Sequence, residues 1–366
     1  MNGCNPTVAT PTPRIAESGL HVAVAVSGGR DSTALLHCVA RAALALGVQV
    51  HALHVHHGLM ADADRWVEHL RAQVGRWSRR GWPVDLHVHR LSDKPQIGDS
   101  VEAWARKRRY AALAQMAQAA GASIVLLAHH RQDQAETVLL QAMRGAGAAG
   151  LSAMPRSAQR GGILWVRPWL DHSRAAIDAY LRRYRLRFVD DQSNHDARFA
   201  RSRLRHDVWP ALVDAFPDAD VSLSLVAQRA QENAACLHEL ATIDLAGCAD
   251  EQSLRVDAWR KLSAARRLLA LRAWLARLDV GPVPETLVQR LALELSAARS
   301  GSWPWHDGGL RLYRGDLRRA SRVEQAAASP LPFAIDLRIR SNGPRARTQP
   351  TPVSKQGAGG FCQCSQ

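Results

Sequence analysis

The chain has 366 residues, and its 48 Lys and Arg exceed its 33 Asp and Glu, so the formal net charge is +15. This length predicts two or three domains, each large enough to bury a hydrophobic core. With 46% hydrophobic and 22% charged residues, the composition excludes a collagen-like chain, a fully disordered chain and a small disulfide scaffold. The basic excess suggests a polyanionic partner such as nucleic acid, although an Arg- and Ala-rich composition is also typical of GC-rich coding.

No segment of the sequence predicts a membrane span or an export signal. The longest apolar stretch, residues 33–50, is interrupted by His37 and Arg41, whereas a span needs about 20 nearly uncharged residues. The N-terminal run MNGCNPTVATPTPR lacks the apolar region of a signal peptide. The six Cys are scattered along the chain, which is typical of a reducing compartment. We therefore expect a cytoplasmic protein with no membrane partner.

Short apolar runs alternate with helical patterns after a predicted flexible N-terminus at residues 1–19. The runs that predict strands are 21–26, 48–56, 84–90, 123–128 and 164–168. The patterns that predict helices are 32–46, 65–78, 100–120, 134–143 and 173–184. Strands that alternate with helices favour right-handed crossovers. We therefore predict an α/β domain at residues 20–210 with a doubly wound, parallel, five-stranded sheet.

A second domain is predicted at residues 215–325. Leu, Ala and Arg recur at helical spacing from about residue 220 to 300, and Trp259 and Trp274 are expected in its core. A hairpin is predicted over 302–320, but the domain as a whole is expected to be all-α. Residues 330–366 are rich in Gly, Pro, Ser and Gln, which predicts a truncated or disordered basic tail.

The most informative motif is Ser-Gly-Gly-Arg-Asp-Ser over residues 27–32, between the first predicted strand and helix. Gly28 and Gly29 allow positive φ and close approach of the backbone to a ligand. The helix start offers free N–H groups to phosphate, and the two serines can donate hydroxyl hydrogens. Asp31 would repel a bare phosphate, so it implies Mg²⁺ or a cationic substrate beside it. A simple strand-to-helix turn is the alternative.

This motif resembles the SGGxDS signature of the PP-loop ATP pyrophosphatases, which cleave ATP between the α- and β-phosphates and adenylate a substrate. Four further runs resemble the tRNA(Ile)-lysidine synthases within that family: HVHHGL at 54–59, AHHRQDQAET at 128–137, RGAGAAGLSAM at 144–154, and DQSN at 191–194 followed by Arg201 to Arg205. The resemblance covers roughly residues 20–320 in order and spacing.

The resemblance implies an ATP-dependent carbon–nitrogen ligase. Such an enzyme activates carbon 2 of the cytidine at the first anticodon position of tRNA(Ile) with a CAU anticodon, through an adenylated tRNA intermediate. Free L-lysine then attacks through its ε-nitrogen to form lysidine, which changes codon reading from AUG to AUA. The resemblance also implies ATP and Mg²⁺ as cofactors and tRNA binding by the second domain, and it leaves a homodimer open.

The resemblance assigns roles to particular positions of this chain. Those expected to be catalytic are Asp31, Asp133, Glu136, Arg201 and Arg203, with Asp31 also the metal ligand. Those expected to bind ATP are Ser27, Gly28, Gly29, Arg30, Asp31, Ser32 and His130. Those expected to bind lysine or tRNA are His57, Arg109, Asp133, Glu136 and Arg144. Asp133 and Glu136 lie three apart and share one helix face, where they could bind an ammonium group; a solvated helix face is the alternative.

Two positions depart from the family pattern. Gln132 stands where the family usually has an acid, and Ser202 stands where the family has Asn. The histidines at positions 51, 54, 56 and 57 suggest a metal site by composition, but strand alternation divides them between two faces, which favours packing or substrate-loop roles.

Two other functions remain open at this point. The first is another PP-loop tRNA-modifying enzyme, such as a 2-thiolation enzyme, which needs cysteine pairs in its ATP domain. The second is a truncated, non-catalytic tRNA-binding remnant, suggested by the unusual C-terminal segment.

Overall fold

The computed structural model describes residues 19–56, 58, 63–92, 101–189, 198–278, 283–305 and 308–321. The predicted flexible N-terminus (up to residue 18), His57, the DQSN run and the predicted tail lie outside the described residues. Within the described ranges, no helix combines the length and the apolar character that crossing a bilayer requires.

The first half of the chain forms a six-stranded sheet in the order β3-β2-β1-β4-β6-β5. Five strands are parallel: β1 (His21–Ala25), β2 (Gln49–His56), β3 (Val84–Arg90), β4 (Ile124–Leu126) and β6 (Ile163–Val166). The edge strand β5 (Ser157–Arg160) pairs antiparallel with β6. The central strands β1 and β4 are neighbours, so the segments that follow them lie side by side at the carboxyl edge of the sheet.

The predicted doubly wound parallel sheet is confirmed, but the predicted count of five strands is one too low. The missed strand β5 reads Ser-Ala-Gln-Arg and is largely exposed, so it has no apolar run that predicts a strand. It is joined to β6 by Gly161 and Gly162, which both have positive φ. Two such glycines form the tight turn that matches the twist of a hairpin, and this turn holds β5 in place.

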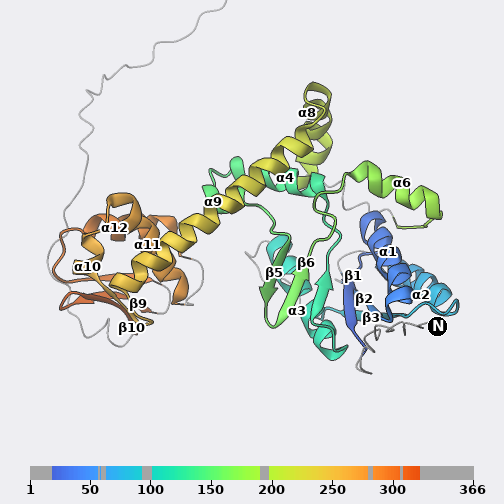
Figure 1. The fold of residues 1–366 in the computed structure, drawn as a ribbon, viewed down its shortest axis with the longest axis horizontal. Helices are drawn as coiled ribbons and strands as arrows, with labels where there is room; N and C mark the ends of the chain where they lie inside the picture. The colour runs from blue at the N-terminus through green and yellow to red at the C-terminus, as the bar shows by residue number, and fades with distance from the viewer. Residues whose placement is uncertain are drawn as a thin grey trace, which may run out of the picture.

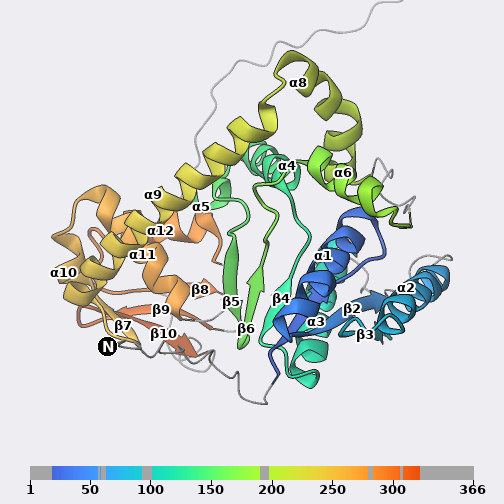
Figure 2. The same ribbon diagram turned by 45° about the vertical axis from the view of Figure 1, so that its right-hand side comes forward.

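Helices cover both faces of this sheet, as Figures 1 and 2 show. On one face α1 (Arg30–Leu46) and α2 (Ala63–Ser78) share a core with β1 and β2, and α6 (Arg174–Tyr184) packs on the outer side of α1. On the other face α3 (Val101–Ala119) packs through Ala112 and Leu113. Helix α4 (Arg131–Ala142) and the short α5 (Ala148–Leu151) follow β4. The carboxyl edge of the sheet therefore carries the starts of α1 and α4.

One long helix links the two halves of the molecule (Figure 1). A short α7 (Ala200–Arg203), a π-helical turn (Leu204–Val208) and α8 (Trp209–Ala215) lead into α9 (Ala219–Cys248). With 30 residues, α9 is about 45 Å long. At its start, Asp220 accepts a hydrogen bond from Arg131 of α4 at 2.7 Å, and Gln231 donates to the Ser152 carbonyl at 2.7 Å. Its other end enters a separate hydrophobic core.

This second core combines helices with a small antiparallel sheet. The helices are α10 (Val256–Arg260), α11 (Ala264–Arg277) and α12 (Glu285–Glu294), and the strands are β7 (Ser253–Arg255), β8 (Gly301–Trp305), β9 (Gly308–Tyr313) and β10 (Asp316–Ser321). The strand order is β7-β10-β9-β8. The β8–β9 pairing confirms the predicted hairpin, and Trp259 and Trp274 are fully buried as predicted.

The expectation of an all-α second domain is therefore wrong. Strand β7 has only three residues, and in β10 two consecutive exposed arginines, Arg318 and Arg319, separate the buried Leu317 and Ala320. A strand of this length leaves no periodic signal that can be separated from the helices around it.

The buried Trp274 is predicted to dominate the stability of the second core. Trp274→Ala should lower the free energy of unfolding of this half by about 3–5 kcal/mol, because it leaves a cavity among fully buried side chains. Leu293→Ala, on the exposed face of α12, should change it by less than about 0.5 kcal/mol. Urea titration of the full chain followed by circular dichroism measures both. Equal losses in the two variants would contradict this packing.

Candidate active site

The glycine-rich loop lies between the end of β1 and the start of α1, as the sequence predicts. Gly28 has φ +89°, a conformation that favours glycine. A Cβ on Gly29 would lie 3.3 Å from the Ser27 hydroxyl oxygen. That hydroxyl lies 3.1 Å from the Ser32 hydroxyl, which donates to the Gly29 carbonyl at 3.1 Å. The two serine hydroxyls therefore connect the loop to the first turn of α1 and fix the shape of the loop.

The loop is held from two sides by other parts of the domain. The buried ring of His54 donates from Nδ1 to the Val26 carbonyl at 2.9 Å, and the Val189 amide donates to the Gly28 carbonyl at 2.9 Å. Burial lowers the pKa of His54, which keeps its ring neutral. The packing role expected for the strand histidines applies to His54. Within the described part of the chain, no three or more His, Cys, Asp or Glu side chains are arranged so that they could hold one metal ion together.

Three side chains from the two neighbouring loops form a row at the carboxyl edge of the sheet. The Nε2 atom of the buried His130 lies 3.8 Å from a carboxylate oxygen of Asp31 and 3.4 Å from one of Asp133. Asp133 also accepts the His130 backbone N–H at 3.0 Å. Burial alone would raise the pKa of Asp133, but His130, Arg201 and the hydrogen bond from the His130 backbone outweigh it and hold that pKa below its usual range. Asp133 is therefore ionised at neutral pH.

Glu136 lies one turn further along α4 and is completely buried. Arg205 binds it with two hydrogen bonds, from Nε at 2.9 Å and from Nη2 at 2.6 Å. The same Nη2 donates to Asp133 at 3.2 Å. The Nε of Arg201 lies 3.2 Å from a Glu136 oxygen, and its Nη2 donates to Thr137 at 2.7 Å. Two arginines thus neutralise a carboxylate that has no access to water.

Arg203, which the resemblance placed among the catalytic positions, is exposed, and its Nη1 donates to the Arg198 carbonyl at 3.1 Å. Residues two apart on a helix point in different directions, whereas residues four apart share a face. Arg201 and Arg205 are four apart, and Arg205 lies in the π-helical turn, a rare element that often occurs at functional sites. Arg205, to which the resemblance assigned no role, is the arginine that contacts both Glu136 and Asp133.

The departure at position 132 has a structural explanation. Gln132 is buried, and its Nε2 donates to a Glu136 oxygen at 3.0 Å. The amide therefore adds a third donor to the buried carboxylate, where an acid would add a second negative charge. Ser202 is also buried.

Arg174 also flanks the row and was not named by the sequence reasoning, and Arg205 was named only as part of a basic run, without a role. Arg30 lies 3.4 Å from Asp178 of α6. Burial lowers the pKa of Arg174, as do the neighbouring Arg30 and Arg205, while Asp31 and Asp178 act in the opposite direction. Arg174 occupies the first position of α6, where the helix dipole disfavours a cation. That unfavourable placement is the sequence signal that could have identified it; the four-residue spacing from Arg201 could have identified Arg205.

A second group of basic side chains lies near Asp133 and comprises Arg106, Arg109, His129 and Arg167. Burial lowers the pKa of Arg109, and the neighbouring Arg106 and Arg201 add to this effect. Burial also lowers the pKa of His129 to about 3, so its ring is neutral beside Asp133 and Arg167. Arg109 thus lies near Arg201 and His129, and its expected role in substrate binding stays a prediction. Arg144 is exposed two residues after the end of α4, about 16 Å along the helix direction from Asp133.

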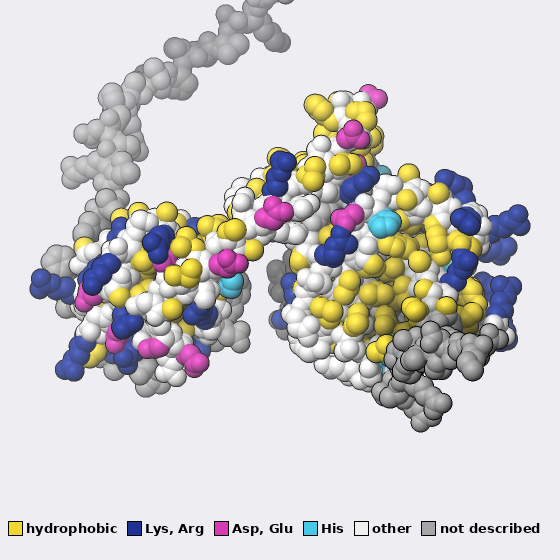
Figure 3. Space-filling model, in the orientation of Figure 1, with side chains coloured by type: hydrophobic (Ala, Val, Ile, Leu, Met, Phe, Trp, Pro, Cys, Tyr) yellow, Lys and Arg dark blue, Asp and Glu magenta, His cyan; other side chains and the backbone are white. Residues whose placement is uncertain are grey.

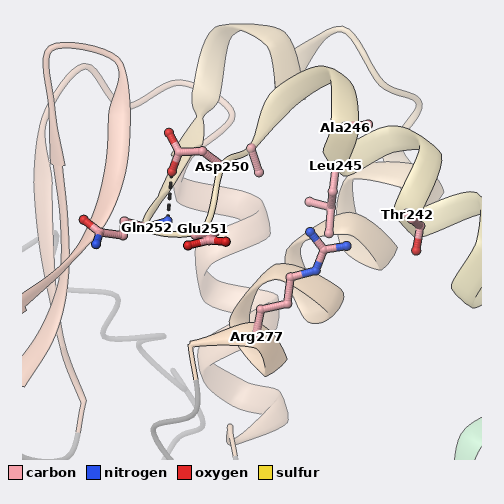
Figure 4. A pocket seen from close by; sticks show the side chains of 8 residues that line it. Thr242, Leu245, Ala246, Asp250, Glu251, Gln252 and Arg277 are labelled. Atoms are coloured by element: carbon pink, nitrogen blue, oxygen red, sulfur yellow. Dashed lines mark hydrogen bonds between the residues drawn. The ribbon is translucent and has the colours of Figure 1, made fainter.

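The hollow in the second half of the molecule is separate from this cluster. It has a volume of about 580 Å³ beside the end of α9. Figure 4 shows Arg277 extending toward it, with Asp250 and Glu251 on the opposite side. One cation and two acids give it no clear preference for an anionic or a cationic ligand.

Comparisons with known proteins match both halves of the chain. A model of the PP-loop domain matches residues 9–212, and a model of the TilS substrate binding domain matches residues 254–318. The tRNA(Ile)-lysidine synthase of Ralstonia nicotianae is 41% identical over 345 residues, which covers 92% of this chain and 72% of that protein. The one from Bordetella pertussis is 43% identical over 270 residues, which covers 72% of this chain and 82% of that protein.

The chain belongs to the tRNA(Ile)-lysidine synthase family. The resemblance inferred from the motifs is confirmed, and with it the prediction of an ATP-dependent ligase of the PP-loop group. The synthase of Pseudomonas aeruginosa is 41% identical over 267 residues, 70% of this chain and 58% of that protein.

A solved structure shares the fold at much lower identity. The U34-tRNA thiolase NcsA from Methanococcus maripaludis aligns with a TM-score of 0.50 at 14% identity, over 58% of this chain and 72% of that one. This likeness shows the fold alone. Between residues 20 and 210 the sequence has a single cysteine, Cys38, so it lacks the cysteine pair that the thiolation alternative requires.

The donor from Gln132 to Glu136 gives a prediction with a matched control. Gln132→Glu should lower the free energy of unfolding by about 1–3 kcal/mol, because it removes a buried donor and adds a like charge beside Glu136. Gln228 makes the same four-residue contact with Glu232 on the exposed side of α9, at 3.1 Å. Gln228→Glu should cost only about 0.5 kcal/mol or less. Chemical denaturation of both variants measures the difference, and equal effects would contradict the account of Glu136 as a buried charge.

Proposed function

We propose that this protein ligates lysine onto carbon 2 of the cytidine at the first anticodon position of tRNA(Ile) with a CAU anticodon, using ATP and forming an adenylated tRNA intermediate. The observation that carries the proposal is the placement of a phosphate-binding loop and a carboxylate–arginine cluster on the same edge of the sheet. Family membership supports the same reaction. The intact cluster argues against a non-catalytic remnant.

ATP phosphates are proposed to bind at the start of α1. The N–H groups of the first turn, the Ser27 and Ser32 hydroxyls and the helix dipole all favour an anion there. Arg30, Arg174 and Arg205 surround Asp31 with positive charge. Arginine suits this role because its planar guanidinium can donate two parallel hydrogen bonds to phosphate.

Asp31 fits the expected role of a Mg²⁺ ligand. Its side chain is partly exposed, and its contacts to Arg30 at 3.4 Å and His130 at 3.8 Å leave carboxylate lone pairs available. Mg²⁺ is commonly held by one or two carboxylates together with substrate phosphates. When bound, the ion would neutralise phosphate charge during cleavage of ATP.

In the first step, the O2 oxygen of the cytidine attacks the α-phosphorus of ATP, and the bond to the β-phosphate oxygen breaks to release pyrophosphate. In the second step, the ε-nitrogen of lysine attacks carbon 2, and the C–O bond breaks to release AMP. The lysine must arrive as a cation and lose its proton before it attacks. The site therefore needs both an anion that binds ammonium and a proton acceptor.

Asp133 is the proposed ligand of the lysine ammonium. It is ionised and more exposed than Glu136, whose oxygens are already bound by Arg205 and Gln132. A lowered pKa makes Asp133 a good charge partner but a weak base. His130, 3.4 Å away, is placed to pass the proton on. Glu136 then acts through Arg205, which it holds in position beside Asp133 and Asp31.

The proposal predicts that sustained pyrophosphate release requires ATP, lysine and the CAU-anticodon tRNA(Ile) together. Purified full-length protein would be assayed with each component omitted in turn. Asp133→Asn should lower the rate with saturating tRNA by about 100-fold or more, while Asp214→Asn, on the exposed surface of α8, should leave it unchanged. Multiple turnovers without lysine, or with an unrelated tRNA, would contradict the proposal.

A further inference from the structure

A second cavity lies on the outer face of the PP-loop half, away from the site described above. It is formed by the later turns of α1, the end of α2 and the end of α6, and has a volume of about 590 Å³. Arg30 and Asp178 connect α1 to α6 near the loop, whereas Arg41 and Tyr184 connect them at the cavity. Eleven residues of α1 separate these points, or about 16 Å. The cavity is therefore a separate site on the same helix.

Aromatic rings form the inner wall of this cavity. The rings of Trp77 and Trp82 are stacked with centroids 5.7 Å apart and an interplanar angle of 26°. His37 contacts both of them and also Tyr184. Trp77 and His37 are buried, and the Arg41 guanidinium lies over the Tyr184 ring at 4.9 Å, but Trp82 is partly exposed. The wall therefore offers the flat ring of Trp82 to a ligand, and flat rings bind nucleobases by stacking.

Arginines surround the opening of the cavity. Five of them line it: Arg41, Arg76, Arg80, Arg185 and Arg187. None of the described residues that line the cavity is acidic. Figure 3 shows Lys and Arg side chains gathered along this edge, over α6 and α2. Arg185 ends α6 with φ 49°, a left-handed conformation where glycine is favoured, so the chain places a guanidinium at the opening despite the strain.

A buried amide in the wall has an unused acceptor. Gln73 is 2% exposed and lines the cavity. Its Nε2 donates to the Arg187 carbonyl at 3.0 Å. Its Oε1 has no hydrogen-bond partner among the described residues, which is uncommon for a buried polar atom and costs free energy. A ligand that carries N–H donors, or a water that it orders, would satisfy this oxygen.

We propose that this cavity, between α1, α2 and α6, is a second nucleotide-binding site that takes a nucleobase against Trp82 and its phosphate against the surrounding arginines. Stacking requires the flat ring, phosphate requires the guanidinium groups, and the amino group of a base is a donor for Gln73. The volume lies within the range of small-molecule sites. The nucleotide is a unit of an RNA strand or a free mononucleotide, and the two sources are separated by the test.

The test measures binding of a short, fluorescently labelled single-stranded RNA to the full chain, without lysine, ATP or any ATP analogue, because a free nucleotide would compete at the proposed cavity. Arg76→Ala/Arg80→Ala should weaken binding about tenfold or more and lower the dependence on salt concentration by about one phosphate contact or more. The control is Arg71→Ala/Arg79→Ala, which changes the charge equally on the same segment but affects residues that do not line the cavity. It should retain binding within about twofold.

The stacking part of the proposal has its own test. Trp82→Ala should weaken binding about tenfold, and Trp82→Phe should restore most of it, because phenylalanine keeps a flat ring. Displacement of the RNA by AMP would identify a free mononucleotide as the ligand, while RNA binding without displacement would identify a strand.

Equal affinities for the two double-arginine variants, or equal losses in Trp82→Ala and Trp82→Phe, would overturn the proposal. The assay contains no lysine and reports no turnover, so its outcome is independent of the proposed ligase reaction.

Discussion

The buried charge of Glu136 is the constraint on which the arrangement of the active site depends. A carboxylate that is fully removed from water is unstable unless hydrogen-bonded cations surround it. Glu136 meets this requirement through two hydrogen bonds from Arg205, with the charge of Arg201 at 3.2 Å and one hydrogen bond from the Gln132 amide in addition. These contacts bind the segment after the DQSN run to α4. The guanidinium of Arg205 is thereby fixed between the carboxylates of α4 and the phosphate-binding loop.

The same side of α4 connects the site to the rest of the molecule. Arg131, at the first position of α4, is bound by Asp220 at the start of α9, and Ser224 of α9 donates to the Arg131 carbonyl at 3.4 Å. Helix α9 is continuous from this point into the second core. We propose that a tRNA held by the second half is oriented toward Asp133 by this helix, because a continuous helix transmits position with little loss.

Much of the fold could be predicted from the sequence because its signals are local. The five parallel strands and their crossover helices lie within a few residues of the predicted ranges, since apolar runs and helical periodicity mark them directly. Strands β5 and β7 could not be predicted in this way. Strand β5 is short and polar and is held by the Gly161–Gly162 turn, and β7 has three residues and pairs with the distant strand β10.

The same distinction applies to the active site, where some residues belong to motifs within one segment and others depend on contacts between distant segments. The loop at Ser27–Ser32 and the Asp133–Glu136 pair follow from motifs within one segment. Arg205 and Arg174 were not assigned, because their roles arise from a π-helical turn and from the packing of α6 on α1. The choice between Arg203 and Arg205 depends on helix phase, which a motif match does not contain. Roles that depend on contacts between distant segments were the ones missed.

The most direct test of this account is a double-mutant cycle between Glu136 and Arg205, read from the free energy of unfolding. Each single change, Glu136→Gln and Arg205→Met, should be destabilising, and the double variant should recover a coupling of about 2 kcal/mol or more. Arg203→Met should show no coupling to Glu136→Gln. A coupling near zero for Arg205, or an equal coupling for Arg203, would contradict the claim that the Glu136–Arg205 pair organises the site.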